Sequence, residues 1–442
     1  MHLMGTHGVR CLVTGSTGYI GSRLIPELIN RGLNVRAMAR TPKKLDDVPW
    51  RADVEVAEGD LTDPDTLVEA FDGVDVVYYL AHAMGTSDDF VAAEREAAEN
   101  VVAAAKKAGV GRIVYLSGLH PSGAELSRHL QSRTAVGDIL IDSGIETIVL
   151  QAGVVIGSGS ASFEMIRHLT DRLPVMTTPK WVHNKIQPIA VRDVLHYLAE
   201  AATAIVPAAR TWDIGGPDVL EYGDMMQVYA EVAGLRRRRI LVLPFLTPTI
   251  ASWWVGHVTP IPAGLARPLV ESLHCDAVAG EQDIDAHISA PSDGKTPYRR
   301  SVELAIDHIN RGQFESSWAS NTPAEPLPSD PDWSGEIVYS DSVSTTTSTS
   351  PDQVFDAMVH ANGRRWHVQS SEPNSTVRLR DWGRLPGDAW MDMRVSARAG
   401  GGAEFEQHVI LCPRGLAGRL YAVTVWPVRR IMLRRRVNRL LA

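Results

Sequence analysis

A glycine-rich segment near the start of the chain has the residue types and spacing needed to bind phosphate. Residues 13–21 read Val-Thr-Gly-Ser-Thr-Gly-Tyr-Ile-Gly. We expect Gly15 to allow a tight turn, Gly18 to let the backbone approach a pyrophosphate, and Gly21 to permit close packing of the following helix. Helix amides and the helix dipole would then attract the phosphates. The expected cofactor contacts of this segment are Gly15, Ser16, Thr17, Gly18, Tyr19, Ile20 and Gly21.

Basic residues follow the second predicted strand, where a dinucleotide would place its adenosine ribose. The strand ends at Arg40, and Lys43 and Lys44 precede the first acidic residue, Asp46. An acid at this point would hold a 2′-hydroxyl, whereas a base suits a 2′-phosphate. The segment therefore predicts NADP(H) in preference to NAD(H), with Arg40 and Lys43 as contacts. The alternative is a solvated basic loop.

Alternating strands and helices must position these residues. Short Val- and Ile-rich segments bounded by Gly or Asp predict six strands: Val9–Thr14, Asn34–Ala39, Val54–Ala57, Val74–Leu80, Arg112–Leu116 and Glu146–Leu150. Between them, helical periodicity predicts Ile20–Arg31, Thr62–Ala70, Asp89–Ala108 and Ser127–Ser143. Connections of this length favour right-handed crossovers, so we expect an α/β fold: a doubly wound, parallel Rossmann sheet with helices on both faces.

The remainder of the chain predicts an extended substrate lobe and a second domain. Further helices are expected at Phe163–Arg172, Val191–Ala204, Glu221–Ala233 and Ser301–Asn310. The lobe would occupy about 161–311 within a first domain of residues 8–319, followed by a proline-rich linker at 320–334. Residues 335–442 then predict an α+β domain with strands at Glu336–Thr345, Ser375–Arg380, Trp390–Ala397 and Glu404–Leu411, a helix at Pro351–His360 and a terminal helix near Leu416–Leu441.

Composition narrows the class of protein. The chain has 442 residues, of which 44% are hydrophobic and 22% charged, as in an ordinary globular protein. Its net charge of −8 argues against bulk nucleic-acid binding. Three widely separated cysteines and no visible signal peptide favour a reducing, cytoplasmic location, and no metal site is expected. The longest apolar stretch, Ile240–Pro262, contains four prolines, so we do not expect it to span a membrane.

Several further motifs, in order over residues 9–160, resemble atypical, extended short-chain dehydrogenase/reductases. They include Gly59-Asp60-Leu61-Thr62, Tyr79-Leu80-Ala81-His82-Ala83 and Arg112–Gly118. The chain looks like the NmrA-like, sugar-nucleotide-epimerase-like NAD(P)H-binding proteins. Its C-terminal domain resembles a helix-grip, polyketide-cyclase-like module. The resemblance implies a second set of cofactor contacts, namely Asp60, Leu61, Ala81, His82, Ala83, Ser117, Arg133 and Gln151. The last of these stands in a segment where the usual Arg-Pro of the family is Gln-Ala.

The chain departs from the family in its catalytic pair. The family uses a Ser after the fifth strand and a helical Tyr-x-x-x-Lys, in which the Tyr transfers a proton and the Lys binds ribose and lowers the pKa of the Tyr. Ser117 is present, but no Tyr occurs between Tyr115 and Tyr197. Near the expected spacing stands His129, with Arg133 one turn later on the same helix face.

This helix face admits three interpretations. In the first, Ser117 bonds a substrate oxygen, Arg133 holds ribose or phosphate, and His129, which would titrate near neutrality, donates a proton. In the second, Ser117 and Arg133 only bind the cofactor and His129 is a solvated helix residue. In the third, proton-transfer chemistry is lost, as in cofactor-sensing relatives.

A mixed polar segment, Trp181–Ile189, lies where the resemblance places a substrate-lining loop. Trp181, Asn184 and Gln187 are the expected substrate contacts, because pockets combine apolar walls with a few polar groups. An ordinary polar loop is the alternative.

The C-terminal domain offers two further features. Trp366, Trp382 and Trp390 would line a small cavity or fill the core. Residues 414–442 contain eight arginines and no acid, and six of these arginines alternate with apolar residues: Arg429, Arg430, Arg434, Arg435, Arg436 and Arg439. This pattern is typical of a helix attracted to anionic lipid, which predicts peripheral contact with the inner face of a membrane. The alternative is a docked helix whose arginines pair with the acidic remainder of the chain.

These features favour an NAD(P)H-dependent oxidoreductase that acts on a hydrophobic carbonyl or quinone-like small molecule. A non-catalytic NADP(H)-binding redox sensor or assembly factor is the alternative, which the missing Tyr-x-x-x-Lys favours. A sugar-nucleotide epimerase is a weaker alternative, because that chemistry normally uses the same Tyr and Lys.

Overall fold

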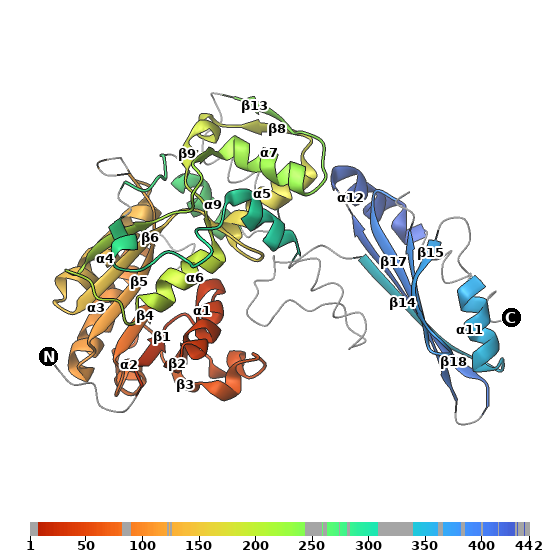
Figure 1. Ribbon diagram of the computed structural model, residues 1–442, viewed down its shortest axis with the longest axis horizontal. Helices are drawn as coiled ribbons and strands as arrows, with labels where there is room; N and C mark the ends of the chain where they lie inside the picture. The colour runs from red at the N-terminus through yellow and green to blue at the C-terminus, as the bar shows by residue number, and fades with distance from the viewer. Residues whose placement is uncertain are drawn as a thin grey trace. The chain divides into compact units, whose positions relative to one another are not determined.

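The computed structural model divides the chain into two compact units (Figure 1). The first comprises residues 1–169 and 175–335, and the second consists mainly of residues 336–442. The structure describes residues 8–81, 90–121, 123, 126–243, 259, 263–273, 275–280, 283–307, 339–360, 366–381, 385–398, 401–413, 415–428, 431 and 437. Among these described residues, no helix combines the length and apolar character needed to cross a bilayer.

The first unit is built on a seven-stranded parallel sheet. Its strands run in the order β11-β6-β5-β4-β1-β2-β3. Their bounds are Arg10–Val13 (β1), Asn34–Ala39 (β2), Glu55–Glu58 (β3), Val76–Tyr79 (β4), Arg112–Gly118 (β5), Glu146–Ala152 (β6) and Arg210–Ile214 (β11). The predicted doubly wound α/β fold is therefore confirmed. Sequence analysis did not anticipate β11, which pairs in parallel with β6.

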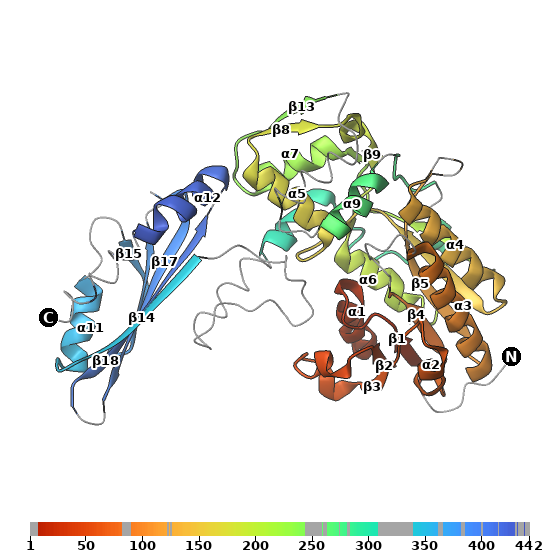
Figure 2. The ribbon, with the colours of Figure 1, turned by 180° about the vertical axis from the view of Figure 1, so that it is seen from behind.

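Helices cover both faces of this sheet (Figures 1 and 2). The helices are Tyr19–Asn30 (α1), Pro64–Phe71 (α2), Phe90–Ala108 (α3), Arg128–Asp142 (α4) and Val191–Glu200 (α6). Cys11 and Val13 of β1 pack in the core cluster that includes residues of α1 and α6. Leu12 packs in the other cluster, with residues of α2, α3 and α4. Successive strand residues thus enter opposite cores, as a sheet buried on both faces requires.

Short strand pairs and further helices extend the first unit beyond the sheet. The helices are Ala161–Arg172 (α5), Tyr222–Val232 (α7) and Ala263–Ser272 (α9). Residues 298–307 are also helical, which overlaps the helix predicted at Ser301–Asn310. The strand pairs are Val155–Ile156 (β7) with Ile189–Ala190 (β10), Lys185–Ile186 (β9) with Leu220–Glu221 (β12), and Val175–Thr178 (β8) with Arg239–Val242 (β13). Four short 3-10 helices complete the list: Pro42–Leu45, Arg51–Asp53, Lys180–His183 and Asp283–Ala286.

The second unit is a five-stranded antiparallel sheet in the order β14-β18-β17-β16-β15. Its strands are Tyr339–Thr347 (β14), Trp366–Glu372 (β15), Thr376–Asp381 (β16), Gly387–Ala397 (β17) and Ala403–Pro413 (β18), and its helices are Pro351–His360 (α11) and Gly415–Thr424 (α12). The predicted α+β order holds, but β15 was not anticipated. The helix α12 ends at Thr424, and after a turn at Val425 residues 426–428 are helical again, so the predicted terminal helix is interrupted.

Large apolar side chains from the sheet and both helices fill the core of the second unit. The core cluster includes Trp366, Phe405, Met358 and Trp426. Trp390 is also buried, whereas Trp382 lies outside the described residues. The linker at 320–334 and the six arginines of the terminal segment lie outside them as well.

Candidate functional site

The glycine-rich segment forms the turn between β1 and α1, and two of its glycines have specific reasons to be there. Gly15 has a φ of 68°, a left-handed conformation that costs other residues about 1–2 kcal/mol. A Cβ on Gly15 would lie 2.9 Å from the Ala81 nitrogen. A Cβ on Gly21 would lie 2.3 Å from the Gly15 carbonyl oxygen. Larger side chains at these two positions would therefore deform the loop.

Hydrogen bonds hold this loop against neighbouring strands. The Thr14 hydroxyl donates to the Tyr78 carbonyl (3.0 Å) and accepts from the Leu80 amide (3.1 Å). The Ser16 hydroxyl donates to the Met38 carbonyl (2.8 Å) at the end of β2. Ser16 is fully buried and does not line the cavity described below, so it braces the loop.

The first turn of α1 is prepared for an anion. Its N-cap residue is Gly18, which has no side chain to cap the helix amides, and the turn contains no acidic residue. The amides and the positive end of the helix dipole are therefore available to a phosphate, as predicted from the sequence. This local chemistry fits the pyrophosphate of a dinucleotide.

A cavity of about 720 Å³ begins at this loop and continues to α9 and the start of α7. Most of the predicted cofactor contacts line it: Gly15, Thr17, Gly18, Tyr19, Ile20, Gly21, Arg40, Asp60, Leu61, Ala81, Ser117 and Arg133. Its other wall is largely apolar, with Val154, Met165, Ile186, Leu269 and Leu273 among the lining residues. Phosphate-binding and apolar surfaces thus share one continuous space.

The adenosine side of the cavity contains Arg40, Asp60 and Leu61. One Asp60 carboxylate oxygen accepts from the Thr62 amide (3.0 Å) and hydroxyl (2.9 Å), which fixes the turn. Leu61 is held by the Asn100 amide group, which donates to its carbonyl (3.0 Å). Arg40 is exposed at the cavity wall, whereas Lys43 is exposed but does not line the cavity.

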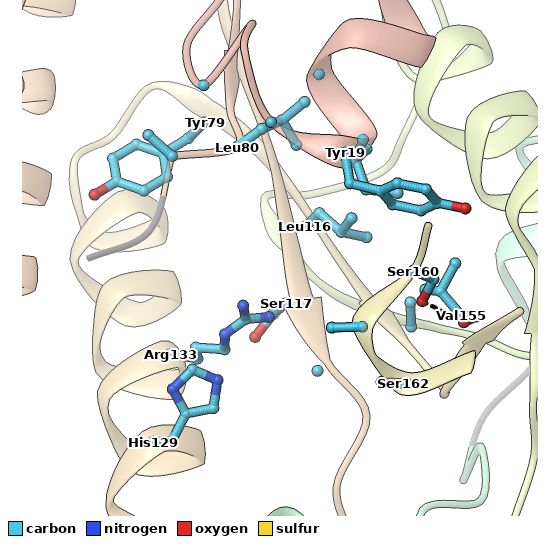
Figure 3. A pocket seen from close by; sticks show the side chains of 18 of the residues that line it. Tyr19, Tyr79, Leu80, Leu116, Ser117, His129, Arg133, Val155, Ser160 and Ser162 are labelled. Carbon is cyan, nitrogen blue, oxygen red and sulfur yellow. Dashed lines mark hydrogen bonds between the residues drawn. The ribbon is translucent and has the colours of Figure 1, made fainter. Parts of the chain in front are cut away.

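Ser117, His129 and Arg133 come together on one wall. Ser117 is the second-last residue of β5, and the other two project from α4; Figure 3 shows the Arg133 guanidinium extending toward Ser117 with the His129 ring beside it. Arg133 Nε is buried without a hydrogen-bond partner, and no ion pair to its guanidinium occurs among the described residues. A buried donor of this kind is costly unless a ligand supplies an acceptor.

One expectation for this wall is wrong. Burial, together with the adjacent Arg133 charge, lowers the pKa of His129 to about 3. The imidazole is therefore neutral at physiological pH and does not titrate near neutrality. A neutral ring can still accept or donate one hydrogen bond, but it holds no imidazolium proton to deliver.

Two polar residues on the cavity wall were not anticipated. Glu94 of α3 is 3% exposed; its Oε2 accepts from the Ser132 hydroxyl, and its Oε1 has no partner. Burial raises the pKa of Glu94 above its ordinary value. The Ser132 hydrogen bond and the Arg133 charge lower this pKa but do not cancel the effect of burial. Tyr222, the first residue of α7, is 1% exposed and also lines the cavity.

A sequence signal exists for the buried carboxyl of Glu94 but not for the position of Tyr222 on the cavity wall. Glu94 precedes Ala97, Ala98, Val101 and Ala105, all buried, at the helical spacing of one face. An acid at the start of such an apolar face indicates a buried carboxyl. Tyr222 begins a helix whose buried face includes Met225, Met226, Tyr229 and Ala230, so its periodicity predicts burial but not a position on the cavity wall, which only the tertiary structure provides.

The predicted substrate contacts lie behind the cavity wall. The Trp181 ring meets the Tyr222 ring edge-on at 5.5 Å. The Asn184 amide donates to the Leu273 carbonyl (2.7 Å), and the Gln187 amide donates to the Gly216 carbonyl (2.7 Å). None of Trp181, Asn184 and Gln187 lines the cavity; they support residues that do.

Three predicted cofactor contacts remain. Gln151, the second-last residue of β6, does not line the cavity, and its amide nitrogen lies 3.1 Å from Nε2 of His120. The cofactor contact that the family pattern implies for Gln151 is therefore not supported by a position on the cavity wall. His82 and Ala83 lie outside the described residues.

Comparison with protein families supports a nucleotide-binding first unit. Residues 15–155 match a family model described as NAD(P)H-binding. Residues 352–436 match a family described as "Protein of unknown function (DUF2867)". The predicted resemblance to NAD(P)H-binding proteins is thus confirmed for the first unit, and the helix-grip assignment of the second stays a prediction.

Curated relatives resemble only part of the chain. A 3 beta-hydroxysteroid dehydrogenase/Delta 5-->4-isomerase of Mycobacterium tuberculosis is 36% identical over 118 residues, which is 24% of this chain and 31% of that protein. A 2-alkyl-3-oxoalkanoate reductase of Stenotrophomonas maltophilia is 36% identical over 112 residues, 25% of this chain and 33% of that protein. The chain therefore spans about a third of the length of the curated relatives it matches.

Solved structures share the fold of the first unit. An NADPH-dependent quinone oxidoreductase of Escherichia coli complexed with NADPH has a TM-score of 0.53 at 20% identity, covering 67% of this chain and 99% of that one. The Citrobacter sp. triphenylmethane reductase complexed with NADP(H) has a TM-score of 0.53 at 19% identity, covering 67% and 99%.

Proposed function

We propose that this protein is an NAD(P)H-dependent oxidoreductase that acts on an apolar carbonyl or quinone-like small molecule. The observation that carries this proposal is the continuity of the cavity, which joins an uncapped helix N-terminus to a largely apolar wall. A reduced nicotinamide would supply a hydride at the point where the two surfaces meet. Relatives named as a quinone oxidoreductase and an oxoalkanoate reductase support the same reaction class.

In such a reaction, the residues that line the cavity would have separate roles. The loop from Gly15 to Gly21 would bind the pyrophosphate. Arg133 would donate to the ribose or a phosphate, because its guanidinium lacks a partner of its own. Ser117 would donate a hydrogen bond to the reacting oxygen of the substrate. His129, neutral at physiological pH, would serve as a wall residue with one available hydrogen bond.

NADP(H) is the proposed cofactor, in preference to NAD(H). Arg40 lines the adenosine side of the cavity and has no recorded ion pair among the described residues, so a 2′-phosphate could bind there. Charge-assisted hydrogen bonds contribute roughly 1.5–3 kcal/mol, equivalent to about 10- to 100-fold in affinity. Lys43 and Lys44 would contribute less, because neither lines the cavity.

The test combines binding with turnover. Fluorescence titration should give a lower Kd for NADPH than for NADH, and Arg40→Ala should reduce the difference. NADPH oxidation should then be followed against a panel of quinones, aldehydes and enones. Equal affinities for the two cofactors would contradict the NADP(H) assignment, and oxidation with no member of the panel would contradict the oxidoreductase assignment.

A second candidate function is a non-catalytic NADP(H) sensor. The low pKa of His129 favours it, because the histidine at the expected acid position cannot act as a proton donor near pH 7. Tight NADPH binding without turnover, accompanied by a change in protease sensitivity on cofactor binding, would support this function over the first.

A further inference from the structure

Tyr222 occupies a fixed position in the apolar wall of the cavity. It begins α7 directly after β12, and β12 pairs with β9 through Leu220 and Ile186. Ile186 is itself a lining residue, and the ring of Trp181 packs edge-on against the ring of Tyr222. The phenol is therefore held between a short sheet and a buried aromatic ring.

The hydroxyl of Tyr222 is buried and has no hydrogen-bond partner in the part of the chain that the structure describes. Burial raises the pKa of this phenol, so the oxygen keeps its proton and remains a donor. An unsatisfied buried hydroxyl costs about 1–3 kcal/mol. Tyr298 provides the contrast within the same unit, because it is equally buried but donates to the Met225 carbonyl (3.0 Å).

No hydrogen bond from the Tyr222 hydroxyl occurs among the described residues. The same cavity is lined by Leu269 of α9 and by Leu273, which follows that helix, and the hydroxyl of Ser272 already donates to the Pro268 carbonyl (2.7 Å). A ligand in this cavity would therefore meet a largely apolar lining in which the phenolic proton of Tyr222 is an unused donor. Such a pocket binds apolar molecules and orients them through a small number of polar contacts.

We propose that the Tyr222 hydroxyl donates a hydrogen bond to an oxygen of the substrate, so that the cavity selects apolar molecules that carry such an acceptor. The inference rests on the proposed function in taking this cavity as the substrate site. It adds a specificity-determining contact, and it predicts discrimination between a ketone and the matching hydrocarbon. A site built around a donor rejects an analogue that leaves the donor unpaired.

The experiment measures binding without turnover. The full-length protein is saturated with NADP⁺, which cannot reduce a ketone, and the dissociation constants of 1-tetralone and tetralin are measured by equilibrium dialysis. Wild type should bind the ketone more tightly than the hydrocarbon. Tyr222→Phe should weaken ketone binding roughly 3- to 10-fold, the value of one neutral hydrogen bond, and leave tetralin binding unchanged.

Tyr78→Phe is the matched control, since it removes a fully buried hydroxyl that donates to the Leu198 carbonyl (2.9 Å) away from the cavity lining and should leave both constants unchanged. Thermal denaturation adds a second measurement. Tyr222→Phe should not lower the Tm, because its hydroxyl has no partner to lose, whereas Tyr78→Phe should lower it.

Three results would overturn the inference: no preference for the ketone in wild type, no binding of either compound, or a preference that survives Tyr222→Phe. Failure of the proposed function is distinguishable from these. A protein that discriminates through Tyr222 but oxidises NADPH with no panel member would retain the binding contact and lose the reaction.

Discussion

At the scale of single residues, the cavity is notable for polar groups that the protein itself does not satisfy. Arg133 Nε, Glu94 Oε1 and the Tyr222 hydroxyl are all buried without partners. Natural proteins rarely leave such groups unpaired unless a ligand, water or reaction uses them. Because all three residues line the same cavity, their unmet hydrogen bonds point to the same conclusion: the site is completed by what it binds.

For the proposed carbonyl reduction, which consumes a proton, we propose the buried Glu94 carboxyl as the proton donor. Burial raises the pKa of its carboxyl, so the protonated form persists to higher pH than in an exposed glutamate. We expect Glu94→Gln to lower kcat by about 10²-fold or more. In wild type, kcat should fall as pH rises through the Glu94 pKa, and this fall should be absent in the variant.

The control for Glu94 is Glu96→Gln, which removes an exposed carboxylate from the same helix. Glutamine at position 94 keeps the shape and can still accept from Ser132, so the variant should remain folded. A Glu94→Gln protein with the kcat and pH profile of wild type would exclude the carboxyl as the proton donor.

The low pKa of His129 predicts how the stability of the fold, rather than turnover, depends on pH. Its folded-state pKa of about 3 lies below the unfolded value near 6.5. The unfolded chain therefore binds a proton that the folded chain does not, and stability falls as pH decreases from about 7 toward 3. His129→Gln should lose less stability than wild type over this range, as measured by urea denaturation at pH 7 and pH 5.

An NMR titration checks the same assignment directly. The His129 ring resonances should stay constant from pH 8 to pH 5. A His129 midpoint near 6.5 would mean that the imidazole is available as an acid after all.

At the scale of elements, sequence patterns predicted what local chemistry determines. Strands β1, β2 and β4 to β6 consist mainly of apolar residues, and their buried side chains leave a strong apolar signal. The strand β11 was missed because its Arg-Thr-Trp-Asp-Ile sequence carries that signal only at Trp212 and Ile214. The edge strand β15 was missed because most of its residues are exposed and polar.

The candidate site shows the same limit. The glycine loop and the Ser117, His129 and Arg133 wall were predictable, because spacing along the chain defines them. The pKa of His129 was not, since it depends on burial and on Arg133 in the folded protein. The predicted substrate contacts do not line the cavity but lie behind residues that do: Trp181, Asn184 and Gln187. A sequence segment can predict where a loop lies but not the direction in which its side chains point.

The turn between β1 and α1 contains Gly15, and its role can be tested by comparing substitutions of Gly15 and of Gly32, which follows α1. Both have positive φ, 68° and 75°, but a Cβ would meet Ala81 and Leu80 only at Gly15, and nothing within 4 Å at Gly32. Gly32→Ala should therefore cost about 1–2 kcal/mol of stability and leave NADPH affinity unchanged.

Gly15→Ala should cost more than Gly32→Ala and abolish NADPH binding, because the loop must shift away from β4. Urea denaturation and fluorescence titration of both variants provide the comparison. Retention of wild-type NADPH affinity by Gly15→Ala would show that the turn does not shape the phosphate site.

At the scale of the whole molecule, the two units carry separable features. Every residue that lines the cavity lies between Gly15 and Ala277, within the first unit. The second unit exposes apolar side chains along its last described helical turns: Leu420 (58%), Val423 (65%), Val425 (46%), Val428 (54%) and Ile431 (54%). Exposed apolar side chains in one short segment are typical of an interaction surface.

The arginines that follow in the sequence suggest which surface this segment meets. Residues 414–442 contain eight arginines and no acid, and we propose on this basis that the segment contacts anionic lipid. We expect the full chain to float with vesicles containing phosphatidylserine and not with vesicles of phosphatidylcholine alone, and 0.5 M salt should reduce the binding because it screens the charges.

Leu420→Glu combined with Val423→Glu should weaken flotation while leaving NADPH affinity unchanged, since neither residue belongs to the cavity. The matched control is Val219→Glu, which adds one acid at an exposed valine of the first unit and should still float. Equal flotation of wild type and the double variant would mean that this apolar segment does not contact lipid. An absence of flotation in wild type would favour the alternative, a terminal helix whose arginines pair within the protein.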